Sequence, residues 1–204
     1  YEIIHAHVMT TATRSGWELP FLKRMGRKLV VHYRGCEARD RERNLSLHPL
    51  GSICERCDYS PDYACRSKRT LERRRLSRRF GDLFLVTTPD MLDFVPEAIH
   101  VPFFASDRGM PDDLKSDRSG QTFRVFHVTT HPGIEGTEEI RASVERLRGR
   151  GYDIELVSLE DVSHEVALAE CHTCDLSVGK MKMGYYANAQ IESMLLGVPT
   201  ITCV

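Results

Sequence analysis

Residues 175–202 have the sequence DLSVGKMKMGYYANAQIESMLLGVPTIT, and this stretch decides the fold. Its first residues predict a short apolar strand, which a loop of glycines and tyrosines connects to a helix that begins near Ala187. The helix carries Ile191, Met194 and Leu195 at spacings of three and four. Because that spacing places the three side chains on one helix face, we expect the stripe to be buried.

The end of this helix is marked by Gly197 and Pro199, residue types that stop a helix and prevent its resumption. The apolar residues 198–204 then predict a second strand, buried on both faces. Glu192 lies one residue off the apolar stripe. In open α/β sheets, ligands bind beyond the carboxyl ends of strands, and a carboxylate there suits a sugar diol. Glu192 is therefore a candidate ligand-binding residue, the alternative being a solvated helix glutamate.

The composition favours a globular protein of one large or two small domains. Of the 204 residues 41% are apolar, and 28 basic residues balance 29 acidic ones, so net charge gives no attraction to nucleic acid. Seven cysteines is an odd number, which argues against a disulfide framework and favours the cytoplasm. No apolar run approaches the roughly 18 residues of a membrane span. Both chain ends lie inside candidate strands, so we expect a fragment.

Strand and helix patterns alternate along the chain, which predicts an α/β fold of two Rossmann-like lobes with parallel sheets. We expect an N-terminal lobe at residues 1–103, a linker at 104–121 and a C-terminal lobe at 122–204. Residues 40–66 lack periodicity and form a cysteine-rich insertion in the first lobe. The predicted elements are residues 2–8, 18–25, 28–33, 67–80, 83–86, a helix start at Asp90, and then 123–128, 137–148, 153–159, 164–171 and 175–178.

The pattern G-Y-Y-x5-E-S-M-x2-G-V-P-T-I over residues 184–201 resembles the donor-binding motif of GT-B glycosyltransferases of the glycosyltransferase 4 type. The resemblance implies transfer of a sugar from a nucleotide-diphosphate sugar to a hydroxyl acceptor, a glycan or a lipid-linked molecule, with retention at the anomeric carbon. It also implies no catalytic metal and a role in cell-envelope polysaccharide biosynthesis. In that family the glutamate matched by Glu192 holds the nucleotide ribose.

A first donor loop is expected at residues 127–137, HVTTHPGIEGT, between a strand and a helix. It includes His131, Glu135 and Gly136, and it offers backbone N–H groups to a diphosphate at a helix N-terminus. The loop is similar to the family's first donor loop, in which a basic residue stands just before Gly-Thr. Here Glu135 takes that place, and a carboxylate beside a diphosphate repels it. The alternative is an ordinary turn capped by Thr137.

A second donor loop holds Lys180 and Lys182 beside Gly184 and Tyr185. A lysine is a point-charge partner for phosphate, and a tyrosine ring can stack on a base or cover a sugar. In the resembling enzymes an acidic residue often stands eight positions before the ribose-binding glutamate. Gly184 occupies that position here, so the paired-glutamate pattern is missing.

Residues 32–39, HYRGCEAR, follow a predicted strand and are similar to the family's loop facing acceptor and donor sugar. Gly35, Glu37 and Arg39 match that loop in kind and are the acceptor-side candidates. Arg34 replaces the usual histidine and is the catalytic candidate, because a fixed cation stabilises a departing diphosphate. We expect His32 to be a core histidine with satisfied hydrogen bonds.

The cysteines Cys36, Cys54, Cys57 and Cys65 have the spacing C-x17-C-x2-C-x7-C. The central C-x-x-C lets two thiolates reach one tetrahedral Zn²⁺, and the flanking cysteines complete a structural site. Scattered free thiols are the alternative. A second C-x-x-C, at residues 171–174, is better explained by two cysteines buried in the core as small apolar residues.

Two other functions fit parts of the sequence. One is a non-catalytic nucleotide-sugar-binding domain of the same fold. The other is a zinc-dependent nucleic-acid-binding module whose phosphate contacts come from the basic residues of 67–80, although this segment lacks interleaved aromatic residues. The same basic segment also suits contact with an anionic membrane surface.

Overall fold

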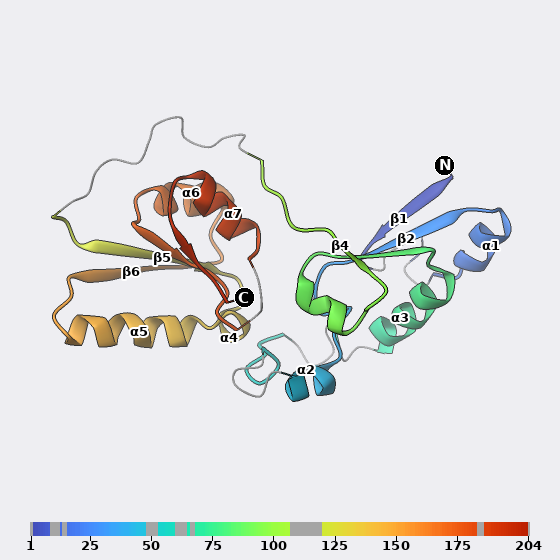
Figure 1. Ribbon diagram of the computed structural model, residues 1–204, viewed down its shortest axis with the longest axis horizontal. Coiled ribbons are helices and arrows are strands. Elements are labelled where there is room, and N and C mark those ends of the chain that lie inside the picture. The colour runs from blue at the N-terminus through green and yellow to red at the C-terminus, as the bar shows by residue number, and fades with distance from the viewer. Residues whose placement is uncertain are drawn as a thin grey trace. The chain divides into compact units, whose positions relative to one another are not determined.

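The computed structural model describes residues 2–8, 13, 16–47, 53–59, 65, 68–106, 120–182 and 186–203 (Figure 1). The chain divides into two compact units. The first comprises residues 1–50 and 59–102, and the second comprises residues 51–58 and 103–204. Each unit contains its own parallel sheet, as expected from the alternation of strand and helix patterns.

The first unit has a parallel four-stranded sheet in the order β1-β2-β3-β4. Its strands are β1 (Ile3–His7), β2 (Lys28–Tyr33), β3 (Leu83–Val86) and β4 (Ile99–His100). Its helices are α1 (Leu19–Arg24), α2 (Arg41–Leu47), α3 (Lys68–Phe80) and the 3₁₀ helix η2 (Pro89–Asp93). The short helix α2 lies inside residues 40–66, where no element was predicted, because seven residues are too few to show a periodic apolar face.

The core of the first unit lies between the sheet and helices α1 and α3, which contact each other. Tyr33 at the end of β2 is fully buried, and its hydroxyl lies 3.0 Å from the hydroxyl of Ser77 on α3. Leu76 and Phe80 of α3 pack against this core. The spacing of Leu71, Leu76 and Phe80 permits one apolar helix face, but Leu71 is exposed, so this face of α3 is narrow.

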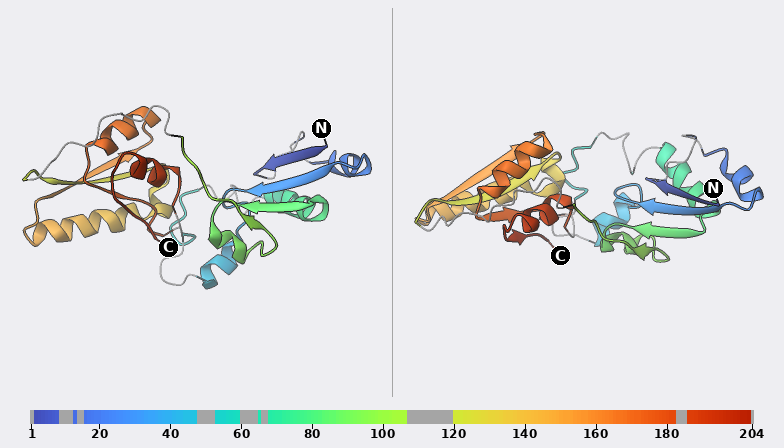
Figure 2. Two further views of the ribbon diagram at one scale, coloured as in Figure 1. Left: turned by 45° about the horizontal axis from the view of Figure 1, so that its top comes forward. Right: turned by 90° about the horizontal axis from the view of Figure 1, so that it is seen from above.

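The second unit has a parallel sheet in the order β6-β5-β7-β8. Its strands are β5 (Phe123–Thr129), β6 (Ile154–Glu160), β7 (Leu176–Val178) and β8 (Thr200–Ile201). Its helices are α4 (Pro132–Glu135), α5 (Thr137–Gly149), α6 (His164–His172) and α7 (Asn188–Leu195). Helix α5 covers one face of this sheet, and α6 and α7 cover the other face (Figures 1 and 2).

The predicted burial of helix α7 is wrong. Met194 and Leu195 are exposed by 53% and 47%, while Gln190 and Ser193 are buried. These two polar side chains tolerate burial because both are hydrogen-bonded: Gln190 accepts from the N–H of Ala187, and Ser193 donates to the backbone carbonyl of Ala189. The helix ends where expected, since Gly197 adopts a φ of 73° that favours glycine.

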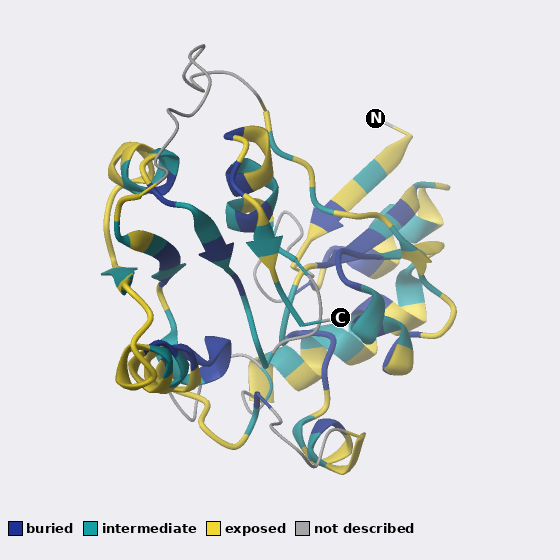
Figure 3. Ribbon diagram, turned by 60° about the vertical axis from the view of Figure 1, so that its left-hand side comes forward, coloured by how far each residue is buried: buried dark blue, intermediate teal, exposed yellow. Residues whose placement is uncertain are grey.

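Strand β8 is shorter than the predicted strand over residues 198–204. It spans Thr200–Ile201, pairs with β7 alone among the described strands, and leaves Ile201 exposed by 48%. Figure 3 shows how buried and exposed positions are distributed over the strands and helices. In the part of the chain that the structure describes, no helix has both the length and the apolar character needed to cross a membrane.

Candidate functional site

The strand order of the second sheet creates a topological switch between β5 and β7. These neighbouring parallel strands are followed by α5 and α7, which lie on opposite faces of the sheet (Figure 1). The loops that leave their carboxyl ends therefore diverge and leave a crevice, the place where open α/β sheets bind ligands. The predicted donor loops follow β5 and β7 and so leave the sheet at this position; of the second loop the structure describes residues 179–182 and 186–187.

A pocket of about 310 Å³ opens at this switch point and is formed entirely by the second unit. Its volume is at the lower end of the roughly 300–1,000 Å³ typical of small-molecule sites. Apolar side chains of β5 and α6 form part of its wall. Thr129, Glu135, His164, Lys180 and Glu192 contribute polar or charged groups.

Glu192 reaches this pocket from the middle of α7, with 18% of its side chain exposed. Its Oε1 lies 3.0 Å from Nε2 of His164, the first residue of α6. A carboxylate has two oxygens and about four acceptor positions, so one histidine contact leaves capacity for a diol. Glu192 thus lines the pocket with acceptor capacity to spare, and its ribose role remains a prediction.

Glu135 and Lys180 form an ion pair within the pocket wall. Lys180 Nζ lies 3.0 Å from Glu135 Oε1, and the Glu135 side chain is 9% exposed. The backbone N–H of Met181 also donates to the carbonyl of Glu135, which ties the two loops together. Glu135, the acidic residue that departs from the family pattern, is therefore paired with Lys180, the residue predicted to bind the diphosphate. A diphosphate has to compete with Glu135 for this lysine.

His127, the first residue of the predicted donor loop, was given no role of its own and is a buried link between the two loops. Its ring nitrogens lie 2.9 Å from the carbonyl oxygen of Val178 and 2.9 Å from Oγ1 of Thr137. It is 1% exposed, and burial lowers its pKa below the usual 6.5. The neutral ring therefore joins the ends of β5 and β7 to the first residue of α5.

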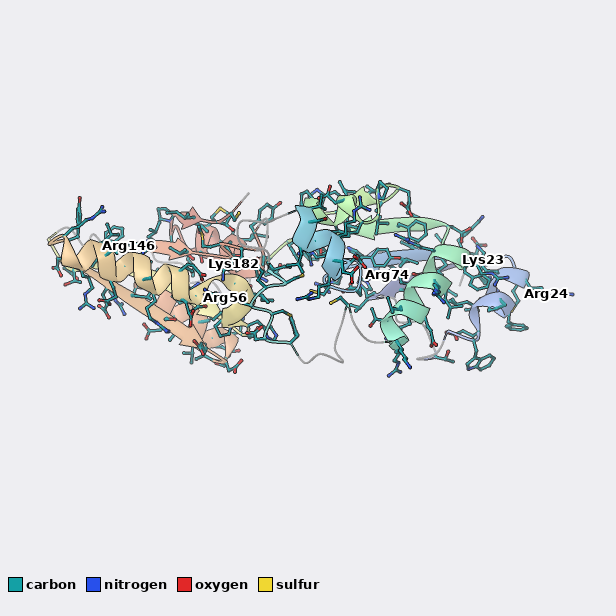
Figure 4. All side chains as sticks on the ribbon, turned by 90° about the horizontal axis from the view of Figure 1, so that it is seen from below. Lys23, Arg24, Arg56, Arg74, Arg146 and Lys182 are labelled. Carbon is teal, nitrogen blue, oxygen red and sulfur yellow. The ribbon has the colours of Figure 1, made fainter. Side chains whose placement is uncertain are left out.

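The N-terminus of α5 already carries negative charge. Gly136 precedes it with a φ of 88°, a conformation that favours glycine, and Glu138 and Glu139 follow in the first turn. Lys182 Nζ lies 2.8 Å from Glu139 Oε1, and this hydrogen bond lowers the pKa of Glu139. Arg56 Nη1 lies 2.9 Å from Glu138 and 3.1 Å from Glu139, at the same end of α5 (Figure 4).

Residues 53–58 belong to the second unit, although we predicted them in the first lobe. Asp58 Oδ2 accepts a hydrogen bond of 3.1 Å from the N–H of Gly133, and its Oδ1 lies 3.6 Å from Nδ1 of His131. The carbonyl of Arg56 also leaves no room for a side chain at Gly133. The cysteine-containing segment is thus held against the first donor loop, and its carboxylate contacts the predicted donor-binding His131.

In the first unit, the predicted acceptor-side loop is held by its own side chains. Glu37 is buried and accepts from the backbone N–H groups of Arg34 and of Gly35, the latter at 3.1 Å. Arg39 is 2% exposed, with its Nε 2.7 Å from Asp90 Oδ2. Arg34, the predicted catalytic residue, is exposed. These contacts fix the loop, and the catalytic and acceptor roles remain predictions.

Part of the basic segment on α3 also serves this loop. Arg74 donates to the backbone carbonyls of Glu37 and Arg39 at 3.0 and 2.8 Å. Arg78 donates to the carbonyl of Phe94 at 2.8 Å. Burial lowers the pKa of Arg74. The side chains of these two arginines are therefore hydrogen-bonded within the first unit, so fewer arginines of α3 remain to contact the phosphates of a nucleic acid.

The four predicted zinc ligands are divided between the units. Cys36 and Cys65 belong to the first unit, and Cys54 and Cys57 belong to the second. None of the four is part of a disulfide, and Cys57 is exposed. The zinc site remains a prediction. Cys171 and Cys174 are buried in the core of the second unit, in agreement with the interpretation of this C-x-x-C as burial-driven.

Gly184 and Tyr185, both predicted to contact the donor, lie outside the described residues. Three residues at or beside the pocket were not predicted as functional: His127, His164 and Asp58. His164 lies 28 positions from Glu192, and Asp58 lies 75 positions from Gly133. Contacts over such separations leave no periodic pattern in a single sequence, so only the fold reveals them.

Comparisons with known proteins support the fold described above. A scan of protein-family models finds no match, and neither does a search of curated proteins. Among solved structures, the chain is similar to a sucrose-phosphate synthase from Thermosynechococcus elongatus, with 15% identity and a TM-score of 0.50 over 99% of this chain and 56% of that one. It is also similar to TarM, with 10% identity and a TM-score of 0.49 over 90% of this chain and 43% of that one.

The chain thus spans about half the length of the solved structures it resembles. At such low identity, the likeness to the sucrose-phosphate synthase bears on architecture and not on activity. The chain has an α/β fold with two Rossmann-like lobes of the GT-B type.

Proposed function

We propose that this chain is part of a glycosyltransferase that moves a sugar from a nucleotide-diphosphate sugar to a hydroxyl acceptor, with retention at the anomeric carbon. The observation that carries the proposal is the pocket at the β5/β7 switch point, whose lining includes Glu192 and Lys180. The resemblance of residues 184–201 to the donor motif is independent of the GT-B fold, and the two agree.

In this proposal the second unit binds the donor. Glu192 accepts hydrogen bonds from the ribose hydroxyls, and His164 orients its carboxylate. Lys180 and the backbone at Gly136 bind the diphosphate, while Tyr185 covers the sugar or the base. The ion pair of Lys180 with Glu135 has to open, or to share the lysine, when the diphosphate enters.

The first unit supplies the acceptor side. Arg34 offers a permanent cation for the charge that develops on the departing diphosphate. The loop after β2 is held in place by the buried Glu37 and Arg39, so that Arg34 projects from a rigid support. We infer that the acceptor-side residues of this unit include Gly35, Glu37 and Arg39.

A non-catalytic nucleotide-sugar-binding domain is the second candidate. It is favoured by the Glu135–Lys180 pair and by the acidic residues at the N-terminus of α5, which weaken the attraction for a diphosphate. The two candidates differ in turnover. The test is to incubate the purified chain with a panel of nucleotide sugars, with and without hydroxyl acceptors, and to measure release of nucleoside diphosphate.

Release that rises with an acceptor and falls in the Arg34→Met variant supports the transferase. Donor binding without release, in wild type and variant alike, supports the non-catalytic domain. The control is Arg27→Met, which removes a cation from the turn before β2, at the opposite end of that strand. This variant should leave the rate unchanged.

A further inference from the structure

Three histidine rings meet on one face of the first sheet. His5 and His7 alternate on β1 and therefore point to the same face, and His7 pairs in register with His32 on β2. The ring centroids are 4.2 Å apart for His5 and His7, 5.4 Å for His5 and His32, and 5.2 Å for His7 and His32. Within the described residues, these three side chains bring one ligand atom each to within 4.8 Å of one another.

This face of the sheet differs from the one that packs against the helices. Ala6, between His5 and His7, is 2% exposed and belongs to the core, whereas both histidines are exposed. His32 is 9% exposed. The cluster thus combines one buried ring with two rings that are exposed at the surface.

His32 does not have the satisfied hydrogen bonds that we expected for a core histidine. Both of its ring nitrogens are buried and lack a hydrogen-bond partner among the residues that the structure describes. Buried polar atoms are normally paired, and an unpaired one calls for an explanation such as an ion. A cation bound to one of these nitrogens supplies such an explanation.

We propose that His5, His7 and His32 bind a divalent transition-metal ion of the Zn²⁺ class. Imidazole nitrogen is a preferred ligand of zinc and of its neighbours in the transition series. Tetrahedral Zn²⁺ with bonds near 2.0–2.1 Å requires ligand nitrogens about 3.3 Å apart. The ligand atoms lie within 4.8 Å of one another, so metal binding requires the exposed rings of His5 and His7 to rotate toward His32.

The charges around the cluster agree with a metal site of limited affinity. Imidazole nitrogen binds a metal ion in its neutral form. Arg34 adds a positive charge that opposes a dication. Three protein ligands leave a fourth coordination position, which an anionic oxygen such as hydroxide suits best beside that arginine.

This site is separate from the cysteines and does not depend on sugar transfer. It is tested on the full chain, stripped of metal with a chelator and titrated with Co²⁺ and with Zn²⁺. The variants are His5→Gln/His7→Gln, Cys54→Ser/Cys57→Ser and, as a matched control, His100→Gln on β4 of the same sheet. Because His5 and His7 are exposed, their replacement leaves the core unchanged, and circular dichroism verifies folding.

Cobalt bound by histidines absorbs in the visible region without the near-ultraviolet charge-transfer band of thiolate ligands. We expect this spectrum in the cysteine variant and in His100→Gln. In His5→Gln/His7→Gln it should be lost, with metal affinity falling by about 100-fold or more, since even removal of a group that only orients a ligand costs ~10–100-fold. Unchanged affinity in the histidine variant, or absence of the spectrum from the cysteine variant, overturns the proposal.

Discussion

The ion pair between Glu135 and Lys180 predicts opposite effects on stability and on ligand binding. Its atoms lie 3.0 Å apart, with side-chain exposures of 9% and 23%. Breaking a fully buried pair costs about 3–5 kcal/mol, and exposed pairs contribute about 0–1 kcal/mol. For this partly buried pair we therefore expect Glu135→Gln to lower the unfolding free energy of the second unit by about 1–3 kcal/mol.

The same substitution should strengthen binding of a nucleoside diphosphate. It removes a carboxylate that repels the ligand and releases Lys180 from its partner. A hydrogen bond to a charged group contributes about 1.5–3 kcal/mol, and part of this is already present in the wild type. We expect a net gain of about 1 kcal/mol, which corresponds to roughly fivefold tighter binding by calorimetry.

A double-mutant cycle with Lys180→Met isolates the pair. Stability is measured by urea unfolding followed with hydrogen exchange of second-unit amides, because the single tryptophan, Trp17, lies in the first unit. The matched control is Glu145→Gln, which removes an exposed carboxylate paired with Arg148 on α5. A coupling energy below about 0.5 kcal/mol, together with weaker ligand binding in Glu135→Gln, contradicts the reasoning.

Three further predictions follow from the site and its support. Glu192→Gln should weaken nucleotide binding, measured by calorimetry, by about 1–3 kcal/mol, because a charge-assisted hydrogen bond is lost. As a control, Glu165→Gln, a change at an exposed glutamate, should leave nucleotide binding unchanged. Arg39→Met should cost about 3–5 kcal/mol of first-unit stability, because it leaves Asp90 without its buried partner, and hydrogen exchange of first-unit amides during urea unfolding reports the loss. Burial lowers the pKa of His127 below 6.5, so the stabilising contribution of its neutral ring is complete above about pH 6.5 and is lost as the pH falls toward the folded-state pKa. Over this range the unfolding free energy of the wild type should fall more steeply than that of His127→Gln. Equal slopes would count against a buried neutral histidine.

The sequence was sufficient to predict every strand except the two-residue β4, and most helices, because their residues form short apolar runs or repeat at helical spacing. The helix α7 shows where this approach fails. Its buried face carries Gln190 and Ser193, whose burial depends on hydrogen bonds to Ala187 and Ala189, whereas hydrophobic periodicity selected Met194 and Leu195. Whether a polar side chain can be buried depends on its hydrogen-bond partners, which the residue type alone does not reveal.

The candidate site was predictable in part for a related reason. Lys180 follows strand β7 and Glu192 lies on helix α7, both next to the switch point, so local sequence patterns indicate where they lie. His164 and Asp58 depend on contacts across 28 and 75 residues, which no local pattern encodes. The histidine cluster required the register of β1 against β2, which pairs His7 with His32.

The central claim is that the pocket at the β5/β7 switch point holds a nucleotide donor, and ligand-induced stabilisation tests it most directly. The measurement is thermal unfolding of the chain with each of a panel of nucleoside diphosphates and nucleotide sugars, in wild type and in Glu192→Gln. Ligand at 100 times its dissociation constant stabilises the folded state by about 2.7 kcal/mol. We predict that at least one nucleotide raises the melting temperature of the wild type and raises that of Glu192→Gln by clearly less. No shift with any nucleotide at millimolar concentration, or equal shifts in both proteins, would contradict the account.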